Sequence, residues 1–319
     1  MTLTPSDRVA SVPPSGIRRF FELAEEMDDV ISLGVGEPDF SAPWAAREAA
    51  ISALERGRTS YTANRGKREL RAAIAANARR WDLDYDPDEE VLVTAGASEA
   101  IDVAFRALVD PGDTVAVAQP CYVSYTPGVT FSGGEVLDVP TRADDEFELT
   151  PEVLYAAGAD EADLLVYCYP NNPTGATMNR PELADVAEFC REHDVDVLAD
   201  EIYADLTYEG DHVSIAEFEG MRERTVVFNG FSKTYAMTGL RLGYAMATGC
   251  ARARPTPGPG GFRRFRTRAR RGRCRSARPL ARTRRGGRRQ RGRRSRRRVR
   301  TPAKPGVRRR GRWPVRRGR

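Results

Sequence analysis

Histidine is scarce in this chain of 319 residues, and cysteine is sparse and irregularly spaced. The two histidines, His193 and His212, belong to no HExxH string, which argues against a histidine-based catalytic triad or a zinc site. The five cysteines lack the spacing of a metal knuckle or a redox pair, so a reducing compartment is expected. The N-terminus has no apolar signal core and no run approaches membrane length, which predicts a soluble cytoplasmic protein.

Acidic residues are absent from the C-terminal part of the chain. Residues 249–319 hold 30 Arg, one Lys and no Asp or Glu. The first 248 residues therefore hold 20 basic and 45 acidic residues, a net charge of −25. So acidic a body is not expected to bind nucleic acid, and negative charge would keep it soluble.

From residue 91 onward, short apolar runs alternate with amphipathic segments. Strands are expected at 91–96, 114–120, 135–140, 163–169, 195–200 and 225–232, and helices at 43–56, 66–80, 97–109 and 181–193. Residues 1–30 predict a loop and then a helix, and residues 31–40 a short strand and a turn. The alternation indicates an α/β fold with three α/β/α layers and a mostly parallel central sheet.

Ligands of such sheets bind beyond the carboxyl ends of the strands. In this sequence those ends carry residues that are polar or conformationally special, namely Gly96, Pro120, Asn171-Asn172, Asp200 and Ser232-Lys233.

The segment VVFNGFSKTYAMTGLRLGY, residues 226–244, places Ser232 and Lys233 after an apolar run and Arg241 eight residues later. This arrangement suits a phosphorylated aldehyde, because the lysine amine can form a Schiff base while serine and arginine hold the phosphate. The alternative is an ordinary lysine at a strand end.

Two further segments suggest contacts to a phosphorylated ring. Ala97 and Ser98 follow Gly96 at a strand–helix junction, where backbone N–H groups and the helix dipole favour an anion. Tyr122 follows a strand end and would stack on a flat ring. Both segments also have a purely structural interpretation. Ser98 could cap the helix, and Tyr122 could be a partly buried core residue.

Three further residues could contact the same phosphorylated ring, namely Asn172, Asp200 and Tyr203. Asn172 lies in the turn string NNPTG and could donate to a phenolate oxygen. Asp200 ends a buried strand, where its carboxylate needs a cationic partner such as a pyridinium N–H, or else caps a helix. Tyr203 could reach the oxygen of the same ring. Together these residues predict a pyridoxal phosphate site with no metal.

The chain resembles the fold-type I, pyridoxal-phosphate-dependent aminotransferases, most closely the class I branch that includes aspartate and aromatic aminotransferases. The match covers residues about 13–248; the strings that carry it occur in family order, and the last three are the most specific. They are LGVGEPDF (33–40), SYTANRGKRELRAAIA (60–75), GASEAI (96–101), QPCYVSY (119–125), YPNNPTGA (169–176), DEIYADL (200–206) and NGFSKTYAMTGLRLGY (229–244).

The resemblance implies a role for each matching position. Lys233 would carry the internal aldimine of pyridoxal 5′-phosphate (PLP) and shuttle a proton, and Asp200 would pair with the ring nitrogen. Asn172 and Tyr203 would hold the ring hydroxyl, with Asn172 also touching the substrate carboxylate, and Tyr122 would stack on the ring and line the substrate site. The phosphate would be bound by Ala97, Ser98, Ser232 and Arg241. Tyr61 would reach the phosphate of a second subunit, which implies a homodimer, and Gly36 would line the substrate pocket.

The implied activity is ping-pong transamination between an L-amino acid and a 2-oxo acid. A PLP-dependent carbon–sulfur lyase of the same fold is the alternative, and a third hypothesis is an inactive scaffold with a tail that binds polyanions. The identity of the amino acid donor is not readable from the sequence.

The chain departs from the family pattern after the GYA segment. The family continues there for well over a hundred residues, which complete a small domain and supply an arginine for the substrate carboxylate. We therefore expect residues 1–35 to be an N-terminal arm and part of the small domain, 36–248 the PLP-binding large domain, and 249–319 a disordered tail. The small domain would be incomplete, with weak stability and little turnover as the result.

The tail itself has three explanations: a polyanion-binding segment, a disordered extension, or translation of a GC-rich gene in the wrong frame after about codon 248. Its richness in Arg, Gly, Pro and Ala, all encoded by GC-rich codons, favours the third. A gene sequence in which no other frame restores a small domain would contradict it.

Overall fold

The computed structural model describes residues 3–14 and 36–249, all within one compact unit that spans Met1–Thr256. The predicted N-terminal helix, the strand expected to begin at residue 31 and the tail after residue 249 lie outside the described residues.

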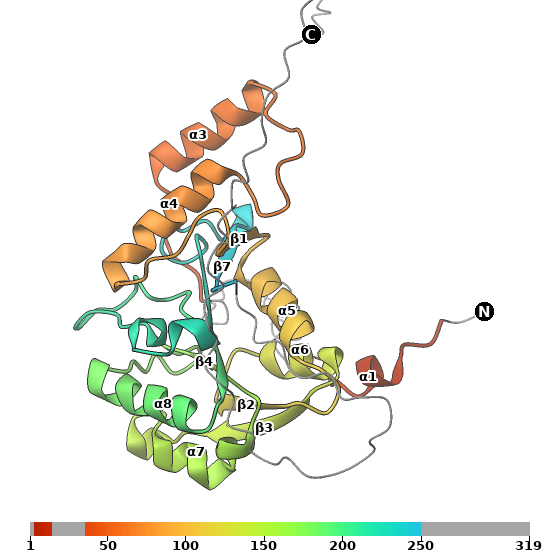
Figure 1. The fold of residues 1–319 in the computed structure, drawn as a ribbon. Coiled ribbons are helices and arrows are strands. Elements are labelled where there is room, and N and C mark those ends of the chain that lie inside the picture. Colours follow the sequence, from red (N-terminus) through yellow and green to blue (C-terminus); the bar gives the residue numbers. More distant parts are fainter. Residues whose placement is uncertain (1–2, 15–35, 250–319) are drawn as a thin grey trace, which may run out of the picture. The chain divides into compact units, whose positions relative to one another are not determined.

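One mixed sheet forms the centre of the described part (Figure 1), with strand order β1-β7-β6-β5-β4-β2-β3. The strands are β1 (Val91–Thr94), β2 (Thr114–Gln119), β3 (Glu135–Pro140), β4 (Leu164–Cys168), β5 (Asp196–Asp200), β6 (Thr225–Gly230) and β7 (Gly243–Met246). Neighbouring strands are parallel except where β7 pairs antiparallel with both β1 and β6. The mostly parallel sheet predicted from the sequence is therefore confirmed, with β7 as its antiparallel member.

The described residues also form seven α-helices. They are α1 (Asp7–Ala10), α3 (Trp44–Glu55), α4 (Arg68–Ala78), α5 (Ala97–Leu108), α6 (Tyr125–Ser132), α7 (Pro151–Ala157) and α8 (Arg180–Glu192). Helix α8 begins with a capping box in which Asn179 and Glu182 satisfy each other's backbone N–H groups. Helices α3, α4, α5 and α8 lie where the sequence predicts them. Helix α6, whose Pro127 and Gly128 disfavour a helix, and the short α7 were not expected.

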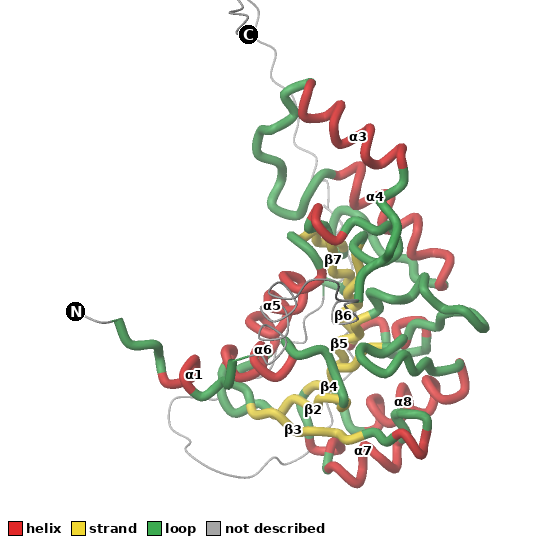
Figure 2. Tube along the Cα trace, turned by 180° about the vertical axis from the view of Figure 1, so that it is seen from behind, coloured by secondary structure: helices red, strands yellow, loops and turns green. Residues whose placement is uncertain are grey.

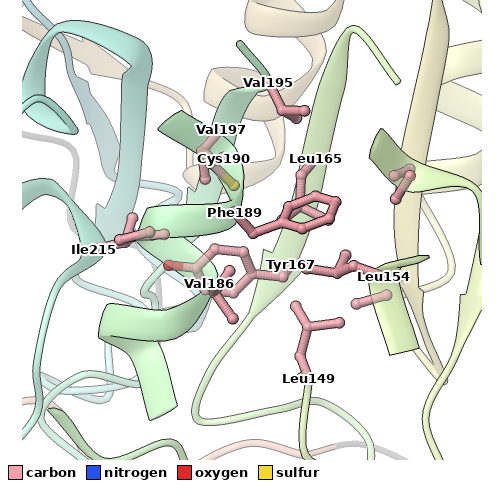
Figure 3. Packing of buried hydrophobic residues seen from close by; sticks show 14 of the residues in the cluster. Leu149, Leu154, Leu165, Tyr167, Val186, Phe189, Cys190, Val195, Val197 and Ile215 are labelled. Carbon is pink, nitrogen blue, oxygen red and sulfur yellow. The ribbon is translucent and has the colours of Figure 1, made fainter. Parts of the chain in front are cut away.

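The core has a layer on each face of the sheet. Helices α5 and α6 pack on one face, where Phe105 and Val129 meet Val166 of β4. Helices α7 and α8 pack on the other face, where Leu154 and Phe189 belong to a second buried cluster (Figure 3). Figure 2 shows helices on both faces from behind. The three-layer α/β/α architecture follows from these two packed faces.

The alternation of side chains along β5 decides which groups face which layer. Leu198 packs on the α5–α6 face and Ala199 on the α7–α8 face, and this alternation continues into the next two residues. Asp200 bonds to Tyr125 of α6, whereas the buried Glu201 accepts hydrogen bonds from Ser214 Oγ at 2.6 Å and lies 3.1 Å from His212 Nε2. Two adjacent buried carboxyl groups are thus kept apart by the sheet.

Candidate functional site

The predicted residues follow strands whose carboxyl ends share one edge of the sheet. Strands β1, β2, β4, β5 and β6 run parallel, so their ends meet there, and the antiparallel β7 begins there. The residues that follow or precede these ends are Gly96–Ser98, Tyr122, Asn172, Asp200–Tyr203, Ser232–Lys233 and Arg241. Six segments of the sequence therefore lie at one edge of the sheet.

Lys233 lies in the turn after β6, with a half-buried side chain. Its Nζ donates to the carbonyl oxygen of Gly36 and lies 5.6 Å from the centroid of the Tyr203 ring. Burial, assisted by the charge of Arg241, lowers the pKa of the Lys233 amine, while Glu37 opposes the shift. A lowered pKa increases the fraction of neutral amine, which is the nucleophilic form.

Two glycines shape the space beside the amino end of α5. Gly96 has φ +89°, and a Cβ built on it would lie 2.5 Å from Nη2 of Arg241. A Cβ on Gly243, the first residue of β7, would lie 2.3 Å from the backbone nitrogen of Ala97. Only residues without a side chain allow the Arg241 guanidinium, the β7 backbone and the start of α5 to approach so closely. A helix N-terminus and a guanidinium side by side form a site suited to an anion.

Arg241 itself has φ +53°, and its Nη1 donates to the carbonyl oxygen of Thr238 at 3.0 Å. Ser98 lies in the first turn of α5, and Ser232 is buried next to Lys233. The structure thus brings Ala97, Ser98 and Arg241 together around the start of α5.

Asp200 is 4% exposed and lies at the end of β5. Its Oδ2 accepts a hydrogen bond from Tyr125 Oη at 2.6 Å, and its Oδ1 accepts one from the backbone N–H of Ile202 at 3.3 Å. Burial raises the pKa of Asp200 to about 6 despite these two donors. The carboxylate therefore lacks a cation in the described part of the chain and is set up to pair with one.

Burial raises the pKa of Tyr203 to about 12, and the neighbouring Asn172 side chain opposes this shift. Asn171, the neighbour of Asn172, makes other contacts, since its Nδ2 donates to the Pro120 and Cys168 carbonyl oxygens. Asn171 therefore ties the turn to the ends of β2 and β4, which leaves Asn172 for the site.

Tyr122 lies beside these groups. Its Oη is 3.4 Å from Ser98 Oγ, and its ring meets the Tyr125 ring edge-on with centroids 5.6 Å apart. The aromatic ring predicted to stack on a ligand is thus anchored near both the start of α5 and the partner of Asp200.

Gly36 is brought into the site through its bond to Lys233, but Tyr61 is not. Tyr61 is fully exposed in the loop between α3 and α4. Its expected role toward a second subunit stays a prediction.

Sequence reasoning overlooked Tyr125 and Glu37. Glu37 Oε2 accepts a hydrogen bond from Thr238 Oγ1 at 3.2 Å and influences the pKa of Lys233. Tyr125 belongs to the recognised string QPCYVSY, but only the fold shows that its hydroxyl reaches a carboxylate 75 positions away.

The raised pKa of Asp200 predicts how the stability of the cofactor-free protein varies with pH. The folded state holds the carboxyl proton more tightly than the unfolded state, so the free energy of unfolding should fall as pH rises from about 4 to about 6. A rise of the Asp200 pKa from 3.8 to about 6 corresponds to ~3 kcal/mol of unfolding free energy. All of this stabilisation is lost once the pH exceeds about 6. Urea denaturation across this range should show the fall in the parent chain and in Asp211→Asn, an exposed control, but not in Asp200→Asn. If the unfolding free energy varied with pH in the same way in all three proteins, the raised pKa would not belong to Asp200.

The described helices include none that is both long and apolar enough to cross a bilayer.

Comparison with known proteins identifies the family. Residues 28–256 match the family model for aminotransferase class I and II. The chain is 52% identical over 248 residues to a putative aminotransferase, YugH, from Bacillus subtilis (strain 168), covering 77% of this chain and 64% of the relative. It is 42% identical over 244 residues to an aspartate aminotransferase from Pyrococcus abyssi, covering 76% of this chain and 63% of the relative.

Among solved structures, the aspartate aminotransferase from Thermus thermophilus with maleate aligns with a TM-score of 0.73 and 39% identity. The alignment covers 78% of this chain and 65% of that one. The chain thus spans somewhat less than two thirds of the length of these relatives. The matched family model, the identities and the shared fold show that the chain belongs to the class I and II aminotransferases, whose cofactor is PLP.

Proposed function

We propose that this chain binds PLP at the carboxyl edge of its sheet and serves the transfer of an amino group between an L-amino acid and a 2-oxo acid. The observation that carries the proposal is a half-buried lysine of lowered pKa at the same edge as a buried aspartate without a cation in the described part of the chain. Family membership supports the reaction class.

The residues present fit the cofactor. The space kept open by Gly96 and Gly243, beside Arg241 and the start of α5, suits a phosphate group. Asp200 offers a buried carboxylate for a ring N–H, and the Asn172–Tyr203 pair offers donors for a ring oxygen. Both ends of a phosphorylated pyridine ring thus find partners.

PLP supplies an electrophilic aldehyde and a protonated ring that withdraws electrons from the substrate α-carbon. In the proposed site Lys233 would hold the cofactor and would move the α-proton of the substrate, while Asp200 would keep a proton on the ring nitrogen. Tyr203 and Asn172 would orient the ring through its oxygen, Tyr122 would stack on it, and Gly36 would line the space for the substrate. The phosphate partners would be Ala97, Ser98, Ser232 and Arg241.

The amino donor is tested first as L-aspartate, because relatives named aspartate aminotransferase match this chain. The chain is incubated with PLP, ¹⁵N-labelled aspartate and 2-oxoglutarate. Transamination predicts ¹⁵N-glutamate and oxaloacetate in equal amounts. In a parallel incubation with an S-alkyl-L-cysteine, release of the thiol, ammonia and pyruvate in equal amounts would instead indicate a carbon–sulfur lyase. Failure of PLP to bind would refute the proposed cofactor site.

We also propose that two copies of the chain associate. Helix α3 has no buried residue, and Trp44, Ile51 and Leu54 on it, with Phe40 before it, are each more than half exposed. Exposed apolar patches of this kind mark interaction surfaces, and Tyr61 follows the same helix.

The expected mass in light scattering is about twice 35.4 kDa. Trp44→Glu should lower the measured mass toward that of a single copy. Tyr208→Glu, which replaces an exposed aromatic residue away from α3 in the sequence, should leave the mass unchanged. A single-copy mass for the parent chain at micromolar concentration would contradict the proposal. A cytoplasmic location stays a prediction.

A further inference from the structure

We propose that Tyr125 is a positioning residue that acts through Asp200: its hydroxyl orients the Asp200 carboxylate and keeps it ionised for a cationic ring nitrogen. The inference rests on the proposed function for its ligand, but the contact between the two residues stands on its own.

The geometry assigns one donor to each oxygen of Asp200. Tyr125, the first residue of α6, is fully buried, and its Oη donates to Oδ2 at 2.6 Å. The backbone N–H of Ile202 donates to Oδ1 at 3.3 Å. The tyrosine bond is the shorter one and lies in the range of strong, charge-assisted hydrogen bonds.

The direction of the Tyr125 bond is also determined. Burial and the neighbouring Asp200 raise the pKa of the Tyr125 phenol well above its usual value. The phenol therefore keeps its proton at every physiological pH and acts as a donor, and a carboxylate is the better acceptor for it. The other titratable groups near Asp200 are Cys168 and Glu201, together with Tyr203 beside the site.

Packing holds the Tyr125 ring in place. It lies in the core cluster with Phe105 and Val129, and its ring meets that of Tyr122 edge-on at 80°. Because the packed ring cannot rotate away, its hydroxyl already points at Asp200 in the absence of a ligand. A ligand therefore binds without the entropic cost of ordering this side chain.

The chemical consequence concerns one shared proton. Between a pyridine nitrogen and a carboxyl group, the proton resides on the more basic partner. A donor on Oδ2 makes the carboxylate less basic, so the proton stays on the ring. Without the Tyr125 hydroxyl, Asp200 would draw the proton to itself, and the ring would lose the charge that makes it an electron sink.

The test is Tyr125→Phe, which keeps the ring and removes the hydroxyl. The matched control is Tyr169→Phe, which removes another buried tyrosine hydroxyl, bonded at 2.7 Å to the carbonyl oxygen of Phe147 in the α7–α8 layer. Two quantities are measured in the full chain: the pH titration of the Asp200 carboxyl by ¹³C NMR without PLP, assigned with Asp200→Asn, and the PLP dissociation constant from visible absorbance.

Tyr125→Phe is expected to move the Asp200 midpoint above about 6 and to weaken PLP binding about tenfold, a fold-change of the size that one charge-assisted hydrogen bond supplies. Tyr169→Phe should change neither. If Tyr125→Phe alters stability alone, with an unchanged carboxyl titration and PLP affinity, the hydroxyl is only structural and the inference is overturned.

If the parent chain does not bind PLP, the proposed function fails, and the carboxyl titration alone still decides whether Tyr125 controls Asp200. If Tyr125→Phe does not fold, incorporation of 3,5-difluorotyrosine at position 125 provides a phenol of similar shape and greater acidity. That stronger donor should lower the Asp200 midpoint, and an unchanged or higher midpoint would overturn the inference.

Discussion

Replacement of Lys233 by alanine is expected to abolish the covalent attachment of PLP to this chain and the visible absorbance that accompanies it. The sequence contains three lysines, Lys67, Lys233 and Lys304. Lys233 combines a half-buried amine, a lowered pKa and a place beside the Tyr203 ring. Because neutral amines attack aldehydes, this lysine should react far faster than an exposed one.

Borohydride reduction followed by peptide mass spectrometry checks the result. The parent chain should carry the reduced pyridoxyl group within residues 226–244, and Lys233→Ala should carry none. Lys67→Ala, at an exposed position before α4, is the control and should be labelled as strongly as the parent chain. Preferential labelling of Lys67 or Lys304 would remove Lys233 from its assigned role. Activity should be lost in Lys233→Ala even if PLP still binds noncovalently.

Gly243→Ala is expected to have the second largest effect. A Cβ at this position would lie 2.3 Å from the Ala97 nitrogen and 2.4 Å from the Gly96 carbonyl carbon. Both contacts are to backbone, so neither can be relieved by a side-chain rotation. Either β7 or the start of α5 must move, which should cost up to ~3 kcal/mol of stability and open the space between Arg241 and the helix.

Two measurements check this prediction: urea denaturation, and phosphate-dependent binding of PLP compared with that of unphosphorylated pyridoxal. Gly243→Ala should lose much of the preference for the phosphorylated form. Gly239→Ala is the control, since a Cβ there meets nothing within 4 Å. Equal stability and equal phosphate preference in both variants would show that the joint between β7 and α5 tolerates a side chain and does not shape the anion site.

Local patterns in the sequence were enough to predict most of the sheet and the residues at its ends. The apolar runs 163–169 and 225–232 became β4 and β6, and the segment 97–109 became α5. These assignments succeed because a strand buried on both faces must be apolar throughout, and because a helix repeats its apolar face within a few residues. Lys233, Asp200 and Arg241 could be named because each stands in a specific string.

The direction of β7 and the contacts around it depend on how strands that are distant in the sequence pair with one another. No local pattern indicates a direction for the apolar run 243–246, and pairing with β1 and β6 made β7 antiparallel. That reversal places Arg241 and Gly243, rather than the end of a strand, beside the start of α5. The different contacts of Asn171 and Asn172 likewise emerge only once β2 and β4 are neighbours.

The sequence by itself determined the order of the strands along the chain, the α/β class and the family's candidate residues, since these rest on local periodicity and on short strings. Only the tertiary structure decided the bond from Tyr125 to Asp200, the separation of Asp200 from Glu201, and the fit of Gly243 against Ala97. Such contacts join residues that are distant in the sequence. No local pattern encodes them, because they depend on the packing of whole elements against each other.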